Sequence, residues 1–154
     1  MQKLVLYSVL SLCFSLLLVV ACSKDKFQTK PTIEIKSISP NPLPKQGDLI
    51  IDLDYTDKEG DLATDSAIYI RKIRINQKPA QTVRDSFWLP LPGEVPKKTK
   101  GSIRLTLNWE TYAKSASNPG SPAQPDSLIF RISMRDASKN ASDTIESGLV
   151  IIEQ

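Results

Sequence analysis

Histidine is absent from this 154-residue chain, and cysteine occurs only twice. The lack of histidine removes the side chain that most often acts as a general base or binds a transition metal. It also leaves the serines without the usual base that activates them as nucleophiles. No G-x-S-x-G segment is present to suggest a serine hydrolase. The sequence therefore predicts a protein that is not an enzyme.

An excess of charge of one sign is also missing. The 20 lysines and arginines are nearly balanced by 17 aspartates and glutamates, so the net charge is only +3. Proteins that bind nucleic acid through the phosphate backbone are usually far more basic. We therefore expect no nucleic-acid partner.

The one long apolar run stands at the start of the chain, where "LVLYSVLSLCFSLLLVV" follows the positive "MQK". It ends in "VVAC" at residues 19–22, which resembles a bacterial lipobox and predicts that Cys22 becomes a lipid-modified N-terminus. Cys13 would be removed with the leader, so no disulfide could form in the mature chain. The alternative is an uncleaved membrane anchor in which Cys22 is incidental, but the polar "SKDK" that follows favours cleavage.

These features predict three parts of the chain: a lipoprotein signal peptide (1–21), a lipidated cysteine with a polar tether (22–31), and one domain (32–154). Several acyl chains together anchor a protein stably in a membrane. We therefore expect a lipid-anchored protein of the cell envelope.

The domain itself is predicted to be all-β, because apolar residues alternate with period two and no stretch shows a helical period. Breaker-rich segments separate the candidate strands. This pattern favours an immunoglobulin-like antiparallel β-sandwich of about seven strands, with a small open barrel as the alternative. The predicted strands cover residues 32–38, 48–56, 67–76, 81–89, 102–110, 127–135 and 143–153.

One of these strands breaks the alternation. Ile68 and Ile70 have one parity and Ile73 and Ile75 have the other. An extra residue near Arg71–Lys72 would bring all four to the core, so the pattern predicts a β-bulge there, or a strand buried on both faces. The basic residues between the isoleucines are interpreted as the solvated side of this strand.

The most distinctive motif is the acidic turn "DKEGD", residues 57–61. Asp57, Glu59 and Asp61 surround Gly60, which tolerates the positive φ of a tight curl. Because loops cluster at each end of a sandwich, Asp136 could approach them. Carboxylates are the ligands that calcium prefers, so these four residues are candidate calcium ligands. The alternative is a plain solvated turn, since Asp and Gly are favoured in any tight turn.

Two motifs together resemble a known family. "YTDKEGDL" (55–62) and "MRDASKNAS" (134–142) each follow a predicted strand, and the chain begins with a lipobox. This combination is similar to small immunoglobulin-like lipoproteins of Bacteroidota, most of which have no assigned function. The resemblance implies the sandwich fold and a location in the outer membrane, at its periplasmic or surface leaflet. Lys139 stands where the second motif usually has glycine.

Trp88, beside Pro90 and Pro92, is the best candidate for a contact with a ligand, whereas Trp109 continues the core side of its strand. The predicted function is a non-catalytic binding or structural module with a protein or glycan partner, for which calcium is a candidate stabiliser. The alternative is a carbohydrate-binding accessory module of a surface glycan-uptake system that uses Trp88.

Overall fold

A computed structural model describes residues 30–75, 85–93, 98–113 and 125–153. The predicted signal peptide, Cys22 and residues 23–29 lie outside this part, as do residues 81–84 of one predicted strand. The described residues form a short π-helical turn, η1 (Trp109–Ala113), and eight strands: β1 (Thr32–Ser39), β2 (Asp48–Thr56), β3 (Ile68–Arg74), β4 (Ser86–Leu89), β5 (Lys100–Asn108), β6 (Asp126–Met134), β7 (Ile145–Glu146) and β8 (Val150–Ile152). Within that part, no helix is both long enough and apolar enough to cross a membrane.

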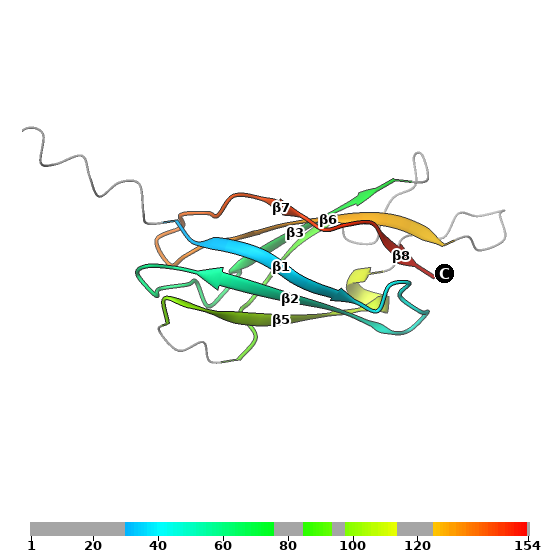
Figure 1. Cartoon of the computed structure of the whole chain (residues 1–154), viewed down its shortest axis with the longest axis horizontal. Coiled ribbons are helices and arrows are strands. Elements are labelled where there is room, and N and C mark those ends of the chain that lie inside the picture. Colours follow the sequence, from blue (N-terminus) through cyan, green and yellow to red (C-terminus); the bar gives the residue numbers. More distant parts are fainter. Residues whose placement is uncertain (1–29, 76–84, 94–97, 114–124, 154) are drawn as a thin grey trace, which may run out of the picture.

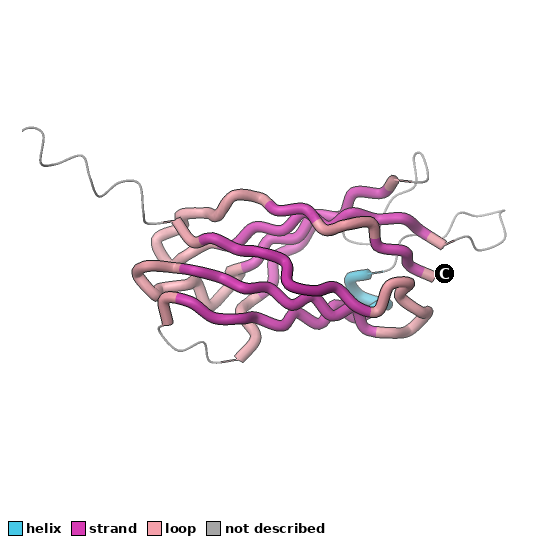
Figure 2. Tube along the Cα trace, viewed as in Figure 1, coloured by secondary structure: helices cyan, strands magenta, loops and turns pink. Residues whose placement is uncertain are grey.

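The strands form two antiparallel sheets that pack face to face (Figure 1). One sheet has the order β1-β2-β5, and the other has the order β4-β3-β6-β7, with β8 also paired to β6. Two antiparallel sheets packed in this way form a β-sandwich. The predicted fold class is confirmed, and Figure 2 shows how much of the described backbone is strand. The predicted last strand is interrupted at residues 147–149, so the described residues form eight strands rather than seven.

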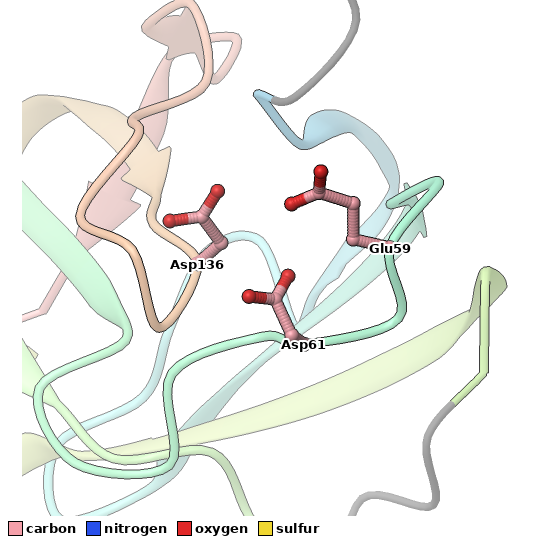
Figure 3. A group of neighbouring side chains, drawn as sticks. All are labelled: Glu59, Asp61 and Asp136. Atoms are coloured by element: carbon pink, nitrogen blue, oxygen red, sulfur yellow. The ribbon is translucent and has the colours of Figure 1, made fainter.

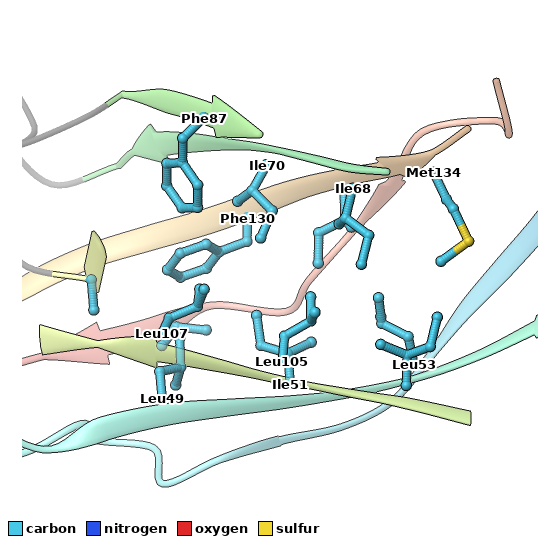
Figure 4. Packing of buried hydrophobic residues seen from close by; sticks show 14 of the residues in the cluster. Leu49, Ile51, Leu53, Ile68, Ile70, Phe87, Leu105, Leu107, Phe130 and Met134 are labelled. Atoms are coloured by element: carbon cyan, nitrogen blue, oxygen red, sulfur yellow. The ribbon is translucent and has the colours of Figure 1, made fainter. Parts of the chain in front are cut away.

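The core lies between the two sheets and follows the period-two pattern. Leu49, Ile51 and Leu53 of β2 are fully buried, and they face Ile70 of β3 and Phe130 of β6 across the interface (Figure 4). Burial of each such side chain stabilises the fold by about 1.5–3 kcal/mol. Since the described part contains no cysteine, this packing holds the two sheets together.

The outer face of the three-stranded sheet is polar, and Asp52 lies at the centre of a hydrogen-bonded group on it. Arg104 donates two hydrogen bonds to Asp52, at 2.8 and 3.1 Å, and Ser37 donates a third at 3.0 Å. The bond from Arg104 is the main reason that the pKa of Asp52 is lowered, with Ser37 contributing. Ser102 donates to Asp54 on the same face. Asp52 and Arg104 thus lie directly across from each other, and the like-charged pair of Glu34 and Asp54 is offset by Lys36, whose ammonium lies 3.7 Å from Asp54.

The bulge predicted in β3 is wrong. β3 pairs with β6 without interruption from Ile68 to Arg74, and its outer face is not buried, because Arg71 is exposed. A bulge occurs instead in β1, between Ile35 and Ser37, where an extra residue turns Ile38 toward the core. β1 is an edge strand with one partner, whereas β3 is paired on both sides, so a bulge in β3 would disrupt two ladders.

As a result, two basic side chains of β3 point into the sandwich. Lys72 is 4% exposed, and its ammonium donates a 2.6 Å hydrogen bond to the carbonyl oxygen of Tyr112 in η1. Burial lowers the pKa of Lys72 to about 8, although Asp85 opposes the shift. Arg74 forms an ion pair with Asp126, which is fully buried. The interpretation of these basic residues as a solvated face is therefore correct only for Arg71.

Candidate cation site

The first acidic turn begins where β2 ends. The Asp57 side chain points back into its own turn: its carboxylate accepts hydrogen bonds from the backbone N–H groups of Asp61, at 2.9 Å, and of Glu59, at 3.4 Å. The N–H of Gly60 donates to the Asp57 carbonyl at 3.2 Å, and Gly60 has φ +64°. Asp57 is 1% exposed, so these bonds compensate for its burial.

The second turn, after β6, repeats this geometry. The Asp136 carboxylate accepts 2.7 Å hydrogen bonds from the backbone N–H and from the side-chain amide of Asn140. The N–H of Lys139 donates to the Asp136 carbonyl at 3.1 Å, and Lys139 has φ +69°. Lys139 thus takes the left-handed conformation that Gly60 takes in the first turn. The turn forms even though a non-glycine residue is strained there.

The two turns lie side by side at one end of the sandwich. Leu62 and Asp136 form an isolated antiparallel bridge, and the N–H of Ala137 donates to the carbonyl of Asp61 at 2.8 Å. This end is also where the chain enters β1, since Lys30 forms a 2.6 Å ion pair with Asp143. Backbone pairing therefore fixes the distance between segments that are far apart in the sequence.

This arrangement brings three carboxylates together. Glu59, Asp61 and Asp136 each offer an oxygen, and these oxygens all lie within 4.8 Å of one another (Figure 3). Glu59 is exposed, Asp61 is half-buried and Asp136 is buried. Three negative charges at this distance repel one another, and a cation between them would remove that repulsion. Atom Oδ1 of Asp61 is buried and makes no hydrogen bond. The group could hold a metal ion.

Three of the four predicted ligands are thus brought together, and Asp57 is not among them. Its carboxylate is engaged by the backbone of its own turn, so its role here is to cap that turn. The motif residue Ser142 is also structural: its hydroxyl accepts a 2.9 Å hydrogen bond from the N–H of Met134 and donates to the carbonyl of Asp143. Ser147 makes the equivalent bonds to Phe130 and Gly148.

Trp88, the predicted contact residue, lies elsewhere on the molecule, on the outer face of the five-stranded sheet. It is 44% exposed, and its ring is 5.1 Å from that of Tyr69. The guanidinium of Arg135 lies 4.2 Å from the centre of the Trp88 ring. Trp109 is buried, as predicted, and its indole N–H donates to the carbonyl of Glu153 at 2.9 Å.

In comparisons with known proteins, the chain matches no family model, no curated protein and no solved structure. The assignment of the fold and of the acidic group therefore rests on the structure alone.

Proposed function

We propose that this protein is a lipid-anchored, non-catalytic binding or structural module of the cell envelope, and that calcium stabilises it. The lipobox-like segment that ends at Cys22 supports the anchor. The convergence of Glu59, Asp61 and Asp136 from two adjoining turns is the observation that carries the calcium assignment.

Calcium is the ion that suits this group best. It takes six to eight oxygen ligands, which three carboxylates and water molecules can supply. Zinc, copper and iron sites usually include nitrogen or sulfur ligands from histidine or cysteine, which this group lacks. Magnesium also binds oxygen but demands a near-ideal octahedral geometry, whereas calcium tolerates irregular sets of ligands. An ion held here would link the turn after β2 to the turn after β6. Such a link would stiffen one end of a sandwich that has no disulfide to do so.

The first test measures thermal unfolding of the full-length protein in a mild detergent, with excess calcium and with a chelator. A ligand that binds only the folded state, present at about a hundred times its dissociation constant, adds about 2.7 kcal/mol. We expect the melting temperature to rise by several degrees with calcium. Asp61→Asn is expected to abolish that rise, because it removes one ligand charge while Asp57 still caps the turn.

Asp57→Asn is the matched control. It weakens the hydrogen bonds to Glu59 and Asp61, and we expect it to lower the chelated protein's stability by about 2 kcal/mol. The rise with calcium should remain, because Asp57 is outside the carboxylate group. No rise in the wild-type protein at millimolar calcium, or a rise that survives Asp61→Asn, would refute the calcium assignment.

The anchor makes a separate prediction. Cys22→Ala is expected to abolish incorporation of a labelled fatty acid and to leave the leader uncleaved, because lipidation of the thiol precedes cleavage in lipoproteins. The label is measured by in-gel detection after growth with an alkyne fatty acid, and Cys13→Ala is the control. Labelling that persists in Cys22→Ala would contradict the anchor.

A carbohydrate-binding accessory module is the second candidate, because the exposed Trp88 lies beside Tyr69. Exposed aromatic rings of this kind can stack on sugars. The position of Arg135 over the Trp88 ring weighs against it, since a cation already occupies part of the surface that a sugar would contact.

A further inference from the structure

The outer face of the five-stranded sheet carries aromatic, arginine and aliphatic side chains, whereas that of the three-stranded sheet is mainly polar. Three successive outward pairs cross from β3 to its neighbours: Tyr69 opposite Trp88, Arg71 opposite Arg131, and Ile73 opposite Ile129. We refer to these six residues as the outer patch. The patch thus places aromatic, basic and aliphatic pairs side by side.

The basic pair in the middle is unfavourable for the isolated domain. Like charges directly opposite each other in a sheet are destabilising. The repulsion is reduced at Arg131, which forms a 2.6 Å ion pair with Glu146. Arg71 is exposed and makes no ion pair within the described part of the chain. On the other sheet, Arg104 is paired with Asp52, and the like-charged pair of Glu34 and Asp54 has the ammonium of Lys36 3.7 Å from Asp54.

Charge on this face is one-sided as well. Arg71, Arg131 and Arg135 all lie on or beside the outer patch, whereas Glu146 is the one acid at the outward positions of the described β3, β4, β6, β7 and β8. A surface with an excess of arginine is complementary to an acidic partner. Arginine, tryptophan and tyrosine are also the residues that most often dominate protein–protein binding.

Apolar residues extend the patch toward the far end of the sheet. Ile73 and Ile129 are half-buried, and Ile75, just after β3, is 53% exposed. Ile75 continues the pairing, since its N–H donates to the carbonyl of Ser127 at 2.8 Å. This end is opposite the one where the chain enters β1 (Figure 1). An anchor at Cys22 would thus join the domain at the end opposite these apolar residues.

We propose that the outer patch docks an acidic protein segment that carries apolar side chains, with its carboxylates on Arg71 and Arg131 and its apolar groups on Ile73 and Ile129. This names the partner of the binding module proposed above, and rests on that proposal. It does not depend on calcium.

The test uses a displayed library of random dodecapeptides, selected on the immobilised full-length protein in mild detergent. We expect the enriched peptides to carry net negative charge and apolar residues, and to change tryptophan fluorescence when bound. Synthetic copies should bind Arg71→Glu and Trp88→Ala at least tenfold more weakly than the wild-type protein, as measured by fluorescence anisotropy. Circular dichroism verifies that each variant is folded.

Lys100→Glu is the matched control, because Lys100 is exposed at the edge of the opposite sheet. It should bind the peptides as the wild-type protein does. The inference is overturned if no peptide family is enriched, if enriched peptides bind Arg71→Glu unchanged, or if Lys100→Glu weakens them equally. It is also overturned if the patch variants instead impair binding to malto- or xylo-oligosaccharides, or to phosphatidylethanolamine–phosphatidylglycerol vesicles. A calcium-dependent rise in melting temperature with any of these results would leave the calcium assignment intact.

Discussion

Asp126→Ala is expected to lower the free energy of unfolding by about 3–5 kcal/mol, because it leaves the charge of Arg74 buried without its counter-ion. The Arg74 side chain is 6% exposed and the Asp126 side chain is not exposed. Two further nitrogens of Arg74, Nε and Nη1, are already buried without a hydrogen bond. The arginine therefore has little to compensate for the lost carboxylate. Urea denaturation followed by circular dichroism measures the effect.

The double variant Arg74→Met with Asp126→Leu distinguishes the cost of one unpaired buried charge from the net contribution of the ion pair to stability. Replacing both charges of a buried ion pair by apolar groups of similar size is often neutral or stabilising. We expect the double variant to recover most of the stability that the single variant loses. A loss below about 1 kcal/mol in Asp126→Ala would mean that solvent reaches Arg74. A double variant as unstable as the single one would show that packing, not charge, sets the cost.

The strands could be predicted from the sequence because each has one buried face. β2 was predicted with its observed bounds, since its apolar residues alternate without a break. Breaks in the alternation of apolar residues were harder to interpret. The isoleucines of β1 and those of β3 break phase in the same way, yet β1 bulges and β3 does not. The difference lies in whether a strand has one neighbour or two, which local sequence does not contain.

The buried charges were missed for a related reason. Lys72 and Arg74 have the same parity as Ile68 and Ile70, and Asp126 has that of Leu128 and Phe130. Strict parity would have placed all three charges inside. The charge of these residues argued against burial. The partners that make their burial tolerable come from distant segments and cannot be seen in the local sequence: η1 supplies the carbonyl for Lys72, and β6 supplies the carboxylate for Arg74.

The acidic group was largely predictable, since loops at one end of a sandwich cluster and the two motifs follow neighbouring ends of strands. It could not be predicted, however, which acid of the first turn caps the turn and which faces Asp136. Alternate acids in "DKEGD" look equivalent in sequence, but the curl at Gly60 turns the Asp57 carboxylate back toward backbone N–H groups and leaves Asp61 facing Asp136. That choice depends on the bridge between Leu62 and Asp136, which is a tertiary contact.

Lys72 is expected to make the protein more stable as the pH rises from about 8 to about 10.5. Its pKa is about 8 in the folded state, whereas the ordinary value for lysine is 10.5. Between these values the unfolded chain binds more protons than the folded chain, so the free energy of unfolding increases with pH. Below pH 8 both states are protonated, and the full cost of burying the ammonium is present. A shift of this size corresponds to about 3 kcal/mol over the whole window.

Lysine and tyrosine side chains in general have unperturbed pKa values near the upper end of this range, so the effect of Lys72 is measured as a difference between variants. Urea denaturation at pH 7 and pH 10 is compared for the wild-type protein, for Lys72→Met, which keeps an unbranched side chain in the core, and for Lys100→Met as an exposed control. We expect the wild-type protein and Lys100→Met to share the same pH dependence, and Lys72→Met to lack on the order of 2 kcal/mol of the gain. Equal gains in all three proteins would show that water reaches the Lys72 ammonium, and that its hydrogen bond to Tyr112 is not made in a dry core.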